Sequence, residues 1–105
     1  MRGEWQHVVY AFAMSAREID HRAPEPPYRQ IAADLAKEIE RGDLLPGRPL
    51  PSEKELTELY GVARETARRA LSVLREQGLI YTVTGRGSYV TEPADRTGGD
   101  ERRNG

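Results

Sequence analysis

The sequence contains no cysteine and only two histidines. Without thiols, the chain can form neither a disulfide framework nor a thiolate metal site. His7 and His21 lie 14 positions apart, outside any regular motif, whereas a catalytic zinc site needs more ligands that converge. No hydrophobic run approaches the roughly 20 residues of a membrane span. We therefore expect no metal, no membrane association and a cytoplasmic location.

Large core side chains are also scarce, since 105 residues include one Trp, one Phe and five Tyr. This composition allows one small domain with a modest core. Nucleophile, base and oxyanion donors do not cluster in the sequence. The turn Gly85-Arg86-Gly87 is too short and wrongly placed to be a nucleotide-binding loop. We therefore expect a protein that is not an enzyme and uses no cofactor.

The chain has no strong overall charge, because its formal net charge is −1. The distribution of charge is uneven. Residues 61–91 contain five basic and two acidic side chains, a local excess of +3. A local basic patch attracts phosphate more effectively than net charge does, although ordinary surface variation could produce the same excess.

Three segments have the apolar spacing of three to four residues that is typical of amphipathic helices. The first covers residues 28–41 and ends in Arg41-Gly42, a cation followed by glycine. The second begins at Ser52, which forms a capping box with Glu55, and ends near residue 60. The third is expected from about residue 63 to residue 77. Three prolines in residues 44–51 exclude a helix between the first two.

After the third helix the pattern changes to β-branched and aromatic residues. Residues 79–83 and 88–91 are predicted strands, joined by the turn Thr84-Gly85-Arg86-Gly87. The expected fold class is mainly α with a small β-hairpin (α+β). Its architecture over residues 28–91 is a winged helix-turn-helix, with three helices and a two-stranded wing.

The first two turns of the third helix combine polar and basic side chains with a buried face. Arg64, Thr66, Arg68 and Arg69 fit a helix that offers hydrogen-bond donors to base edges, since the arginine fork matches the two acceptors of guanine. Most charged helix faces are only solvated, however, and winged helices also dock on proteins. The residues alone favour DNA binding and leave these alternatives open.

A longer set of motifs resembles the DNA-binding domain of the GntR family of bacterial transcription regulators. The matching stretches are Tyr28-Arg29-Gln30-Ile31, Gly42-Asp43-Leu44-Leu45-Pro46-Gly47, Leu50-Pro51-Ser52-Glu53-Lys54-Glu55-Leu56, Tyr60-Gly61-Val62-Ala63-Arg64, Thr66-Ala67-Arg68-Arg69-Ala70-Leu71, Gly78-Leu79-Ile80 and Gly85-Arg86-Gly87-Ser88-Tyr89-Val90.

The resemblance implies a sequence-specific regulator, with repression favoured over activation. Its third helix would lie in the major groove and its wing in the minor groove of duplex DNA, at an inverted-repeat operator bound by a homodimer. The implied DNA-binding residues are Ser52, Glu53, Lys54, Arg64, Thr66, Arg68, Thr84, Gly85, Arg86 and Gly87. The alternative function is a protein-interaction module that docks on, or antagonises, another regulator.

This sequence departs from the family pattern in three respects. Ala63 replaces the usual serine, which removes a helix cap worth about 1 kcal/mol. Glu65 brings a negative charge to the start of the third helix, where it favours the helix dipole and repels phosphate. Only 14 polar residues follow Thr91, where family members carry an effector-binding and dimerising domain. We therefore expect no small-molecule effector.

The segments outside the match have separate predictions. Residues 1–23 form an N-terminal extension, in which Trp5, Val8, Val9, Phe12, Ala16 and Ile19 share one helical stripe. A helix over residues 5–20 would bury this stripe against the domain or in a homodimer. Met14 as the true start, with the preceding residues loose or untranslated, is the alternative. Residues 24–27 are a proline-rich linker, and residues 92–105 are an expected disordered tail.

Overall fold

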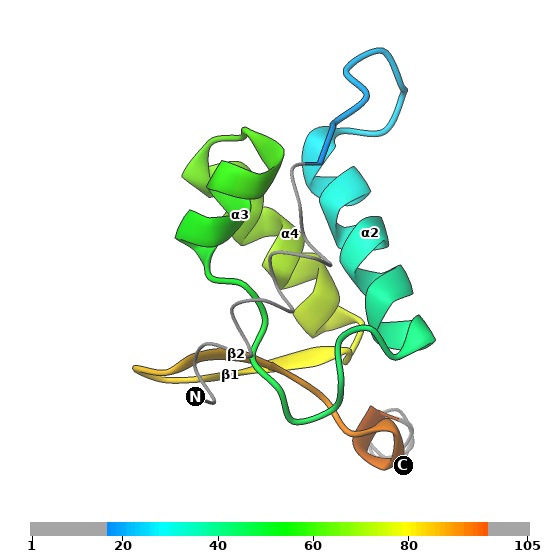
Figure 1. Cartoon of the computed structure of the whole chain (residues 1–105), viewed down its shortest axis with the longest axis vertical. Coiled ribbons are helices and arrows are strands. Elements are labelled where there is room, and N and C mark those ends of the chain that lie inside the picture. Colours follow the sequence, from blue (N-terminus) through cyan, green and yellow to red (C-terminus); the bar gives the residue numbers. More distant parts are fainter. Residues whose placement is uncertain (1–16, 97–105) are drawn as a thin grey trace.

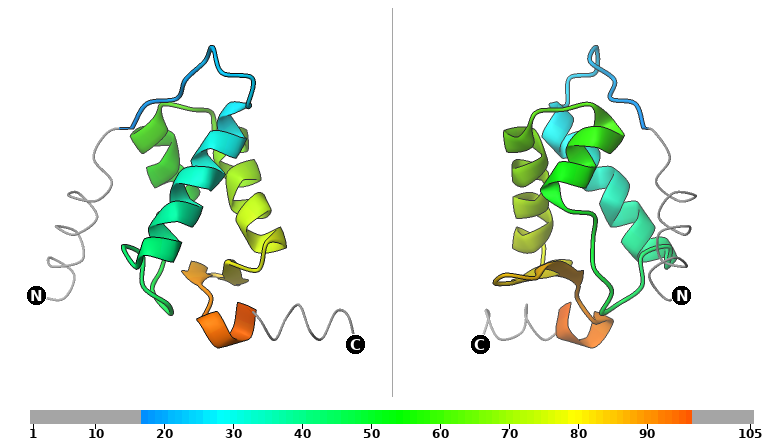
Figure 2. Two further views of the ribbon diagram at one scale, coloured as in Figure 1. Left: turned by 90° about the vertical axis from the view of Figure 1, so that its right-hand side faces the viewer. Right: turned by 60° about the vertical axis from the view of Figure 1, so that its left-hand side comes forward.

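The computed structural model describes residues 17–96. Three helices pack together above a two-stranded antiparallel hairpin (Figures 1 and 2). The elements in chain order are α2 (Pro27–Arg41), α3 (Glu53–Tyr60), α4 (Arg64–Glu76), β1 (Ile80–Val83) and β2 (Gly87–Val90). This arrangement confirms the predicted winged helix-turn-helix, and the helix bounds agree with the predicted ones to within one residue at each end.

Local capping explains where the helices begin and end. Pro27 occupies the first turn of α2, where a missing N–H costs nothing, and Gly42 ends the helix with a φ of 87°. The predicted capping box opens α3: the Ser52 hydroxyl accepts the Glu55 N–H at 3.1 Å, and the Glu55 carboxylate accepts the Ser52 N–H at 2.8 Å. Gly61, with a φ of 65°, then turns the chain toward α4.

One side of each helix and the inner side of the hairpin enclose a single core. The side chains of Ile31 and Leu35 on α2 meet those of Leu56 on α3 and Leu74 on α4, and all four are fully buried. Val90 closes the core from the wing. The core therefore fixes the orientation of α4 relative to both α3 and the hairpin.

The hairpin pairs Ile80 with Val90, Tyr81 with Tyr89 and Thr82 with Ser88. Alternation along the strands puts Ile80 and Val90 in the core, whereas the rings of Tyr81 and Tyr89 stack 5.9 Å apart. The proline-rich loop also runs along β2, because Leu50 N–H donates to Ser88 and Val90 N–H donates to Arg48. The sequence excluded a helix in this loop but gave no sign of this pairing.

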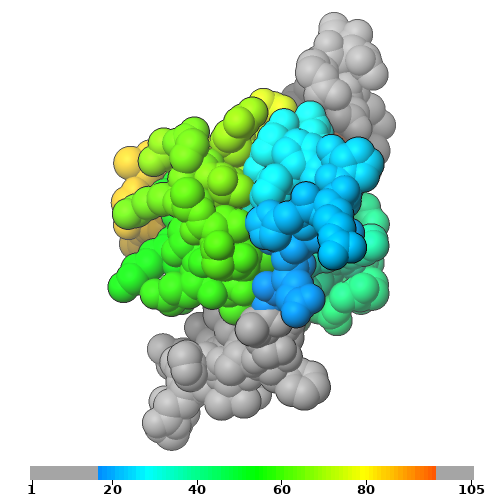
Figure 3. All heavy atoms as spheres, turned by 90° about the horizontal axis from the view of Figure 1, so that it is seen from above, coloured from blue at the N-terminus to red at the C-terminus, as the bar shows by residue number. Residues whose placement is uncertain are grey.

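The N-terminal segment differs from its prediction. Residues 17–20 are not helical, so the predicted helix over residues 5–20 is wrong at its C-terminal end. The backbone N–H of Arg17 donates to the carbonyl of Leu59, and Ile19 packs against the core. The segment therefore lies against the domain, as Figure 3 shows. The other residues of the apolar stripe lie outside the described part of the chain.

Arg17 also makes an ion pair with Glu38, a carboxylate on α2 of which only 6% is exposed. Its guanidinium further contacts Asp34 and the Tyr60 hydroxyl, at 3.4 and 3.2 Å. Burial raises the pKa of Glu38 above the ordinary value for glutamate, although the hydrogen bond from Arg17 opposes this effect. One side chain thus connects the N-terminal segment to both α2 and α3.

The segments on either side of the domain contain turns and a short helical stretch, where they are described. Residues 21–25 form turns and bends, and the predicted linker contributes Pro27 to α2. Residues 93–96 are helical, although the sequence predicted disorder from residue 92. Pro93 suits the start of a helix, and the Glu92 carbonyl accepts the N–H groups of Asp95 and Arg96. The rest of the tail, residues 97–105, lies outside the described residues.

Candidate nucleic-acid interface

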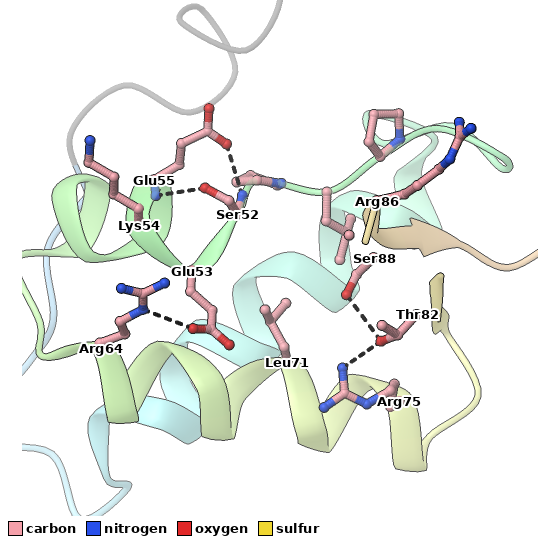
Figure 4. A pocket seen from close by; sticks show the side chains of 14 residues that line it. Ser52, Glu53, Lys54, Glu55, Arg64, Leu71, Arg75, Thr82, Arg86 and Ser88 are labelled. Atoms are coloured by element: carbon pink, nitrogen blue, oxygen red, sulfur yellow. Dashed lines mark hydrogen bonds and ion pairs between the residues drawn. The ribbon is translucent and has the colours of Figure 1, made fainter. Parts of the chain in front are cut away.

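The start of α3, the length of α4 and the inner side of the wing surround an open cleft of about 360 Å³ (Figure 4). Elements far apart in the sequence meet here because the core packs α4 against both α3 and β1. The charged and hydroxyl side chains that line the cleft are Ser52, Glu53, Lys54, Glu55, Arg64, Arg75, Thr82, Arg86 and Ser88.

Glu53 lies between the two arginines that the family resemblance implies in base reading. Its Oε1 accepts a hydrogen bond from Arg64 Nε at 3.0 Å, and its Oε2 is 3.6 Å from Arg68 Nε. Arg64 and Arg68 are neighbours on one helix face, where two cations alone would repel each other. The shared carboxylate relieves this repulsion and orients both guanidinium groups, which remain 69% and 54% exposed.

Glu65 pairs with the same arginine cluster. Its carboxylate accepts a hydrogen bond from Arg68 Nη1 at 2.8 Å, one helical turn away. The negative charge that departs from the family pattern therefore accompanies a cation. Exposed pairs of this kind stabilise the fold by at most about 1 kcal/mol, so their main effect is on side-chain orientation.

The capping box positions the acidic and basic side chains at the start of α3. Because Ser52 fixes the first turn, Glu53 points toward α4 and Lys54 points away from it at the rim of the cleft (Figure 4). Lys54 is exposed. Ser52 lines the cleft while its hydroxyl oxygen accepts the helix-capping hydrogen bond.

The wing turn brings backbone and one cation to the opposite rim. Gly85 and Gly87 have φ values of 79° and 119°, in the region that L side chains rarely adopt. A Cβ atom at either position would meet nothing within 4 Å, so conformation rather than crowding requires glycine. Arg86 and Gly87 line the cleft, and Thr84 is exposed in the same turn.

The structure separates Thr66 and Arg69 from the cluster that contains Arg64. Thr66 lies two residues, about 200° of helix rotation, from Arg64, and it is half-buried. Arg69 stacks over the ring of Tyr28 at 4.3 Å, on the side of α4 that faces α2. Four predicted site residues, Thr66, Arg68, Thr84 and Gly85, do not line the cleft, and of these four only Thr66 is half-buried rather than exposed.

Sequence reasoning did not identify Arg75, Thr82 and Ser88 as cleft residues. Arg75 donates to Thr82 Oγ1 at 2.9 Å, and the Thr82 and Ser88 hydroxyl oxygens lie 3.4 Å apart. A signal was available for Arg75, because it lies eleven residues after Arg64 and therefore on the same helix face. No such signal exists for the two wing residues, which depend on the hairpin register.

The described residues give no sign of a metal centre or membrane segment. Among residues 17–96, no group of three acidic or histidine side chains could hold a metal ion. Across the same range, every helix is too short or too polar to span a bilayer. The chemistry available at the cleft is therefore that of cations, carboxylates, hydroxyls and backbone amides.

A tight helix-turn-helix, followed by a two-stranded wing and carrying exposed arginines at the start of its second helix, defines a winged helix-turn-helix protein. The family model described as "Bacterial regulatory proteins, gntR family" matches residues 27–90. The chain belongs to this family, which confirms the resemblance inferred from its motifs.

Curated relatives are transcription regulators. The chain is 45% identical over 75 residues to the transcriptional repressor NagR of Bacillus subtilis (strain 168), a match that covers 71% of this chain and 31% of NagR. It is 46% identical over 68 residues to the mannosyl-D-glycerate system repressor MngR of Escherichia coli (strain K12), covering 65% of this chain and 28% of MngR. The chain thus spans about a third of the length of these relatives.

Solved structures share the fold. The DNA-binding domain of AraR, crystallised in complex with operator ORX1, is similar with a TM-score of 0.68 and 33% identity, covering 73% of this chain and 98% of that one. YtrA from Sulfolobus acidocaldarius, a GntR-family transcription factor, is similar with a TM-score of 0.67 and 32% identity. That match covers 82% of this chain and 90% of YtrA.

Proposed function

We propose that this chain binds a specific duplex DNA operator and represses transcription, with α4 in the major groove and the wing tip in the minor groove. The observation that carries the proposal is the cluster in which Glu53 orients Arg64 and Arg68 at the exposed start of α4. Family membership and the operator complex of AraR support it. The protein acts without catalysis.

Each proposed contact follows from its chemistry. Arg64 and Arg68 read guanines through their paired donors, because O6 and N7 of guanine match the guanidinium fork. Ser52 and Lys54 contact the backbone, which positions the protein without reading sequence. The turn from Thr84 to Gly87 enters the minor groove, where glycine permits close approach and Arg86 meets the negative potential.

The proposed operator is an inverted repeat bound by two copies of the chain. A single α4 reads only a few base pairs, and a two-fold symmetric pair of domains doubles the site read. Two copies on half-sites one helical turn apart, about 34–36 Å, would place both α4 helices on the same side of the duplex.

The test is selection of preferred duplexes from a random pool, followed by salt-dependent gel shifts. We expect enrichment of an inverted repeat and affinity that falls steeply with salt, because binding releases counterions. A protein-docking module would enrich no sequence and would show little salt dependence. That outcome would overturn the proposed function.

Single substitutions then assign the roles. Arg64→Ala and Arg68→Ala should each cost about 1–3 kcal/mol for the selected sequence and reduce discrimination at one base position. Lys54→Ala should weaken selected and random duplexes equally, which makes it the comparison for a charge that does not read sequence. Unchanged sequence preference in both arginine variants would show that α4 does not read the bases.

A further inference from the structure

Arg75 is a cation of the cleft to which the family pattern gives no role. It lies eleven residues after Arg64 and seven after Arg68 on α4. At about 100° per residue, these three side chains fall within about 40° of one another around the helix axis. Arg69, by comparison, is about 140° from Arg64 and stacks on Tyr28. Arg75 therefore extends the arginine stripe of α4 toward the base of the wing.

The guanidinium of Arg75 is held in place by neutral groups. Nη1 donates to Thr82 Oγ1 on β1 at 2.9 Å, and Nη2 donates to Ser72 Oγ on α4 at 3.1 Å. Ser88 on β2 lies next in the chain of hydroxyls, 3.4 Å from Thr82. These contacts fix the position of the group, and Figure 4 shows it pointing from α4 toward the wing.

Arg75 differs from the other two arginines of the stripe in whether a carboxylate neutralises its charge. Arg64 and Arg68 share the Glu53 carboxylate, whereas within residues 17–96 no carboxylate forms an ion pair with Arg75. Two of the five donors of its guanidinium are used by the hydroxyls, which leaves three for a ligand. A fixed, unneutralised guanidinium with free donors matches the paired oxygens of a phosphodiester.

The surroundings favour the same ligand. The cleft that Arg75 lines also carries Lys54, Arg64 and Arg86, and it opens between α4 and the wing. Its carboxylates are engaged, since Glu53 pairs with arginines and Glu55 accepts the Ser52 N–H. If α4 and the wing occupy adjacent grooves, the DNA strand that separates those grooves passes through this cleft.

We propose that Arg75, held by Thr82 and Ser72, binds a backbone phosphate of the DNA strand that passes between α4 and the wing. This inference rests on the proposed DNA-binding function. Since phosphate is present in every sequence, Arg75 contributes affinity and fixes the position of the wing relative to α4, but it reads no base. Because Thr82 bonds the same guanidinium, the contact also couples the wing to the bound strand.

The test measures binding of the full chain to a labelled duplex of random sequence over a range of salt concentrations. Arg75→Gln keeps an amide that can reach Thr82 but loses the charge. We expect it to lower affinity about tenfold, and the slope of log affinity against log salt to become less steep by about 0.9. Arg22→Gln, an exposed residue of the turn before α2, is the control for loss of one charge.

Two further variants distinguish phosphate binding by Arg75 from a role limited to holding the wing against α4 through Thr82. Arg75→Lys keeps the charge, so its salt slope should equal that of the wild type while affinity falls less than in Arg75→Gln. Thr82→Val removes the hydroxyl that holds the guanidinium, and it should weaken binding with the salt slope unchanged. Thermal melts of each variant report whether the fold is retained.

The outcomes distinguish this inference from the function on which it rests. If the wild type binds no duplex, the proposed function fails and the role of Arg75 fails with it. If the wild type binds but Arg75→Gln behaves like Arg22→Gln, only the phosphate contact is refuted. An affinity loss in Arg75→Gln without any change in salt slope also refutes it, because the residue would then act only on the position of the wing.

Discussion

Arg17→Met tests whether the buried ion pair between Arg17 and Glu38 stabilises the domain. The substitution keeps an apolar stem of similar length but removes the cation. Glu38 would then be a buried carboxylate without its partner, and its Oε1 already has no hydrogen-bond partner among the described residues. Breaking a buried pair in this way costs about 3–5 kcal/mol near neutral pH.

That loss is large for a domain of this size. At about 0.05–0.15 kcal/mol per residue, the 80 described residues have an unfolding free energy of roughly 4–12 kcal/mol. Arg17→Met should therefore unfold at a much lower urea concentration than the wild type, with far-UV circular dichroism as the signal.

The loss should also depend on pH. Burial raises the pKa of Glu38 in the folded state, and removing Arg17 takes away the hydrogen bond that opposes this rise. A carboxyl with a raised folded-state pKa favours folding below its unfolded pKa, near 4.5, and loses that contribution as the pH rises through the folded value. The deficit of Arg17→Met should thus be greatest near neutral pH and shrink toward pH 4.5.

A second substitution completes the test. Arg17→Met combined with Glu38→Leu removes both charges, so most of the lost unfolding free energy should return near neutral pH. The Tyr60 hydroxyl, which donates to Asp34 at 3.1 Å, should keep this acceptor in both variants. A deficit below about 1 kcal/mol, a deficit that does not vary with pH, or a double variant no better than Arg17→Met would refute this reasoning.

Two further predictions concern the start of α4. Glu53→Gln removes the carboxylate that orients Arg64 and Arg68, so preference for the selected operator over random duplex should fall about tenfold. Binding to random duplex should at the same time strengthen, because a negative charge is lost; equal changes for both duplexes would contradict the orienting role. Ala63→Ser supplies a hydroxyl at an N-cap that has no side-chain hydrogen bond, and should raise unfolding free energy by about 1 kcal/mol in urea titrations. Ala33→Ser, at an exposed position in the interior of α2, is the control and should destabilise slightly; a gain in both variants would show that capping is not the cause.

Local patterns were sufficient to place the helices and the hairpin. The Ser52–Glu55 capping box, Gly42 and Gly61 act over three or four residues, so the sequence records them directly. The arginine spacing on α4 is likewise a property of one helix. The GntR-family motifs added the candidate site, including residues such as Lys54 for which helical spacing alone offers no role.

Only the tertiary structure determined which side chains meet across elements. Glu53 joins Arg64 and Arg68 because α3 packs against α4, and Arg75 meets Thr82 because the hairpin register places that hydroxyl above the helix. Thr66 lies in the first turn of α4, where the sequence predicted a DNA contact, but it faces away from the cleft. Residues 17–20 follow the domain surface and are not helical, since Arg17 gains Glu38 and Leu59 as partners there. Such contacts depend on packing angles and loop lengths, which the spacing of residues within one element does not contain.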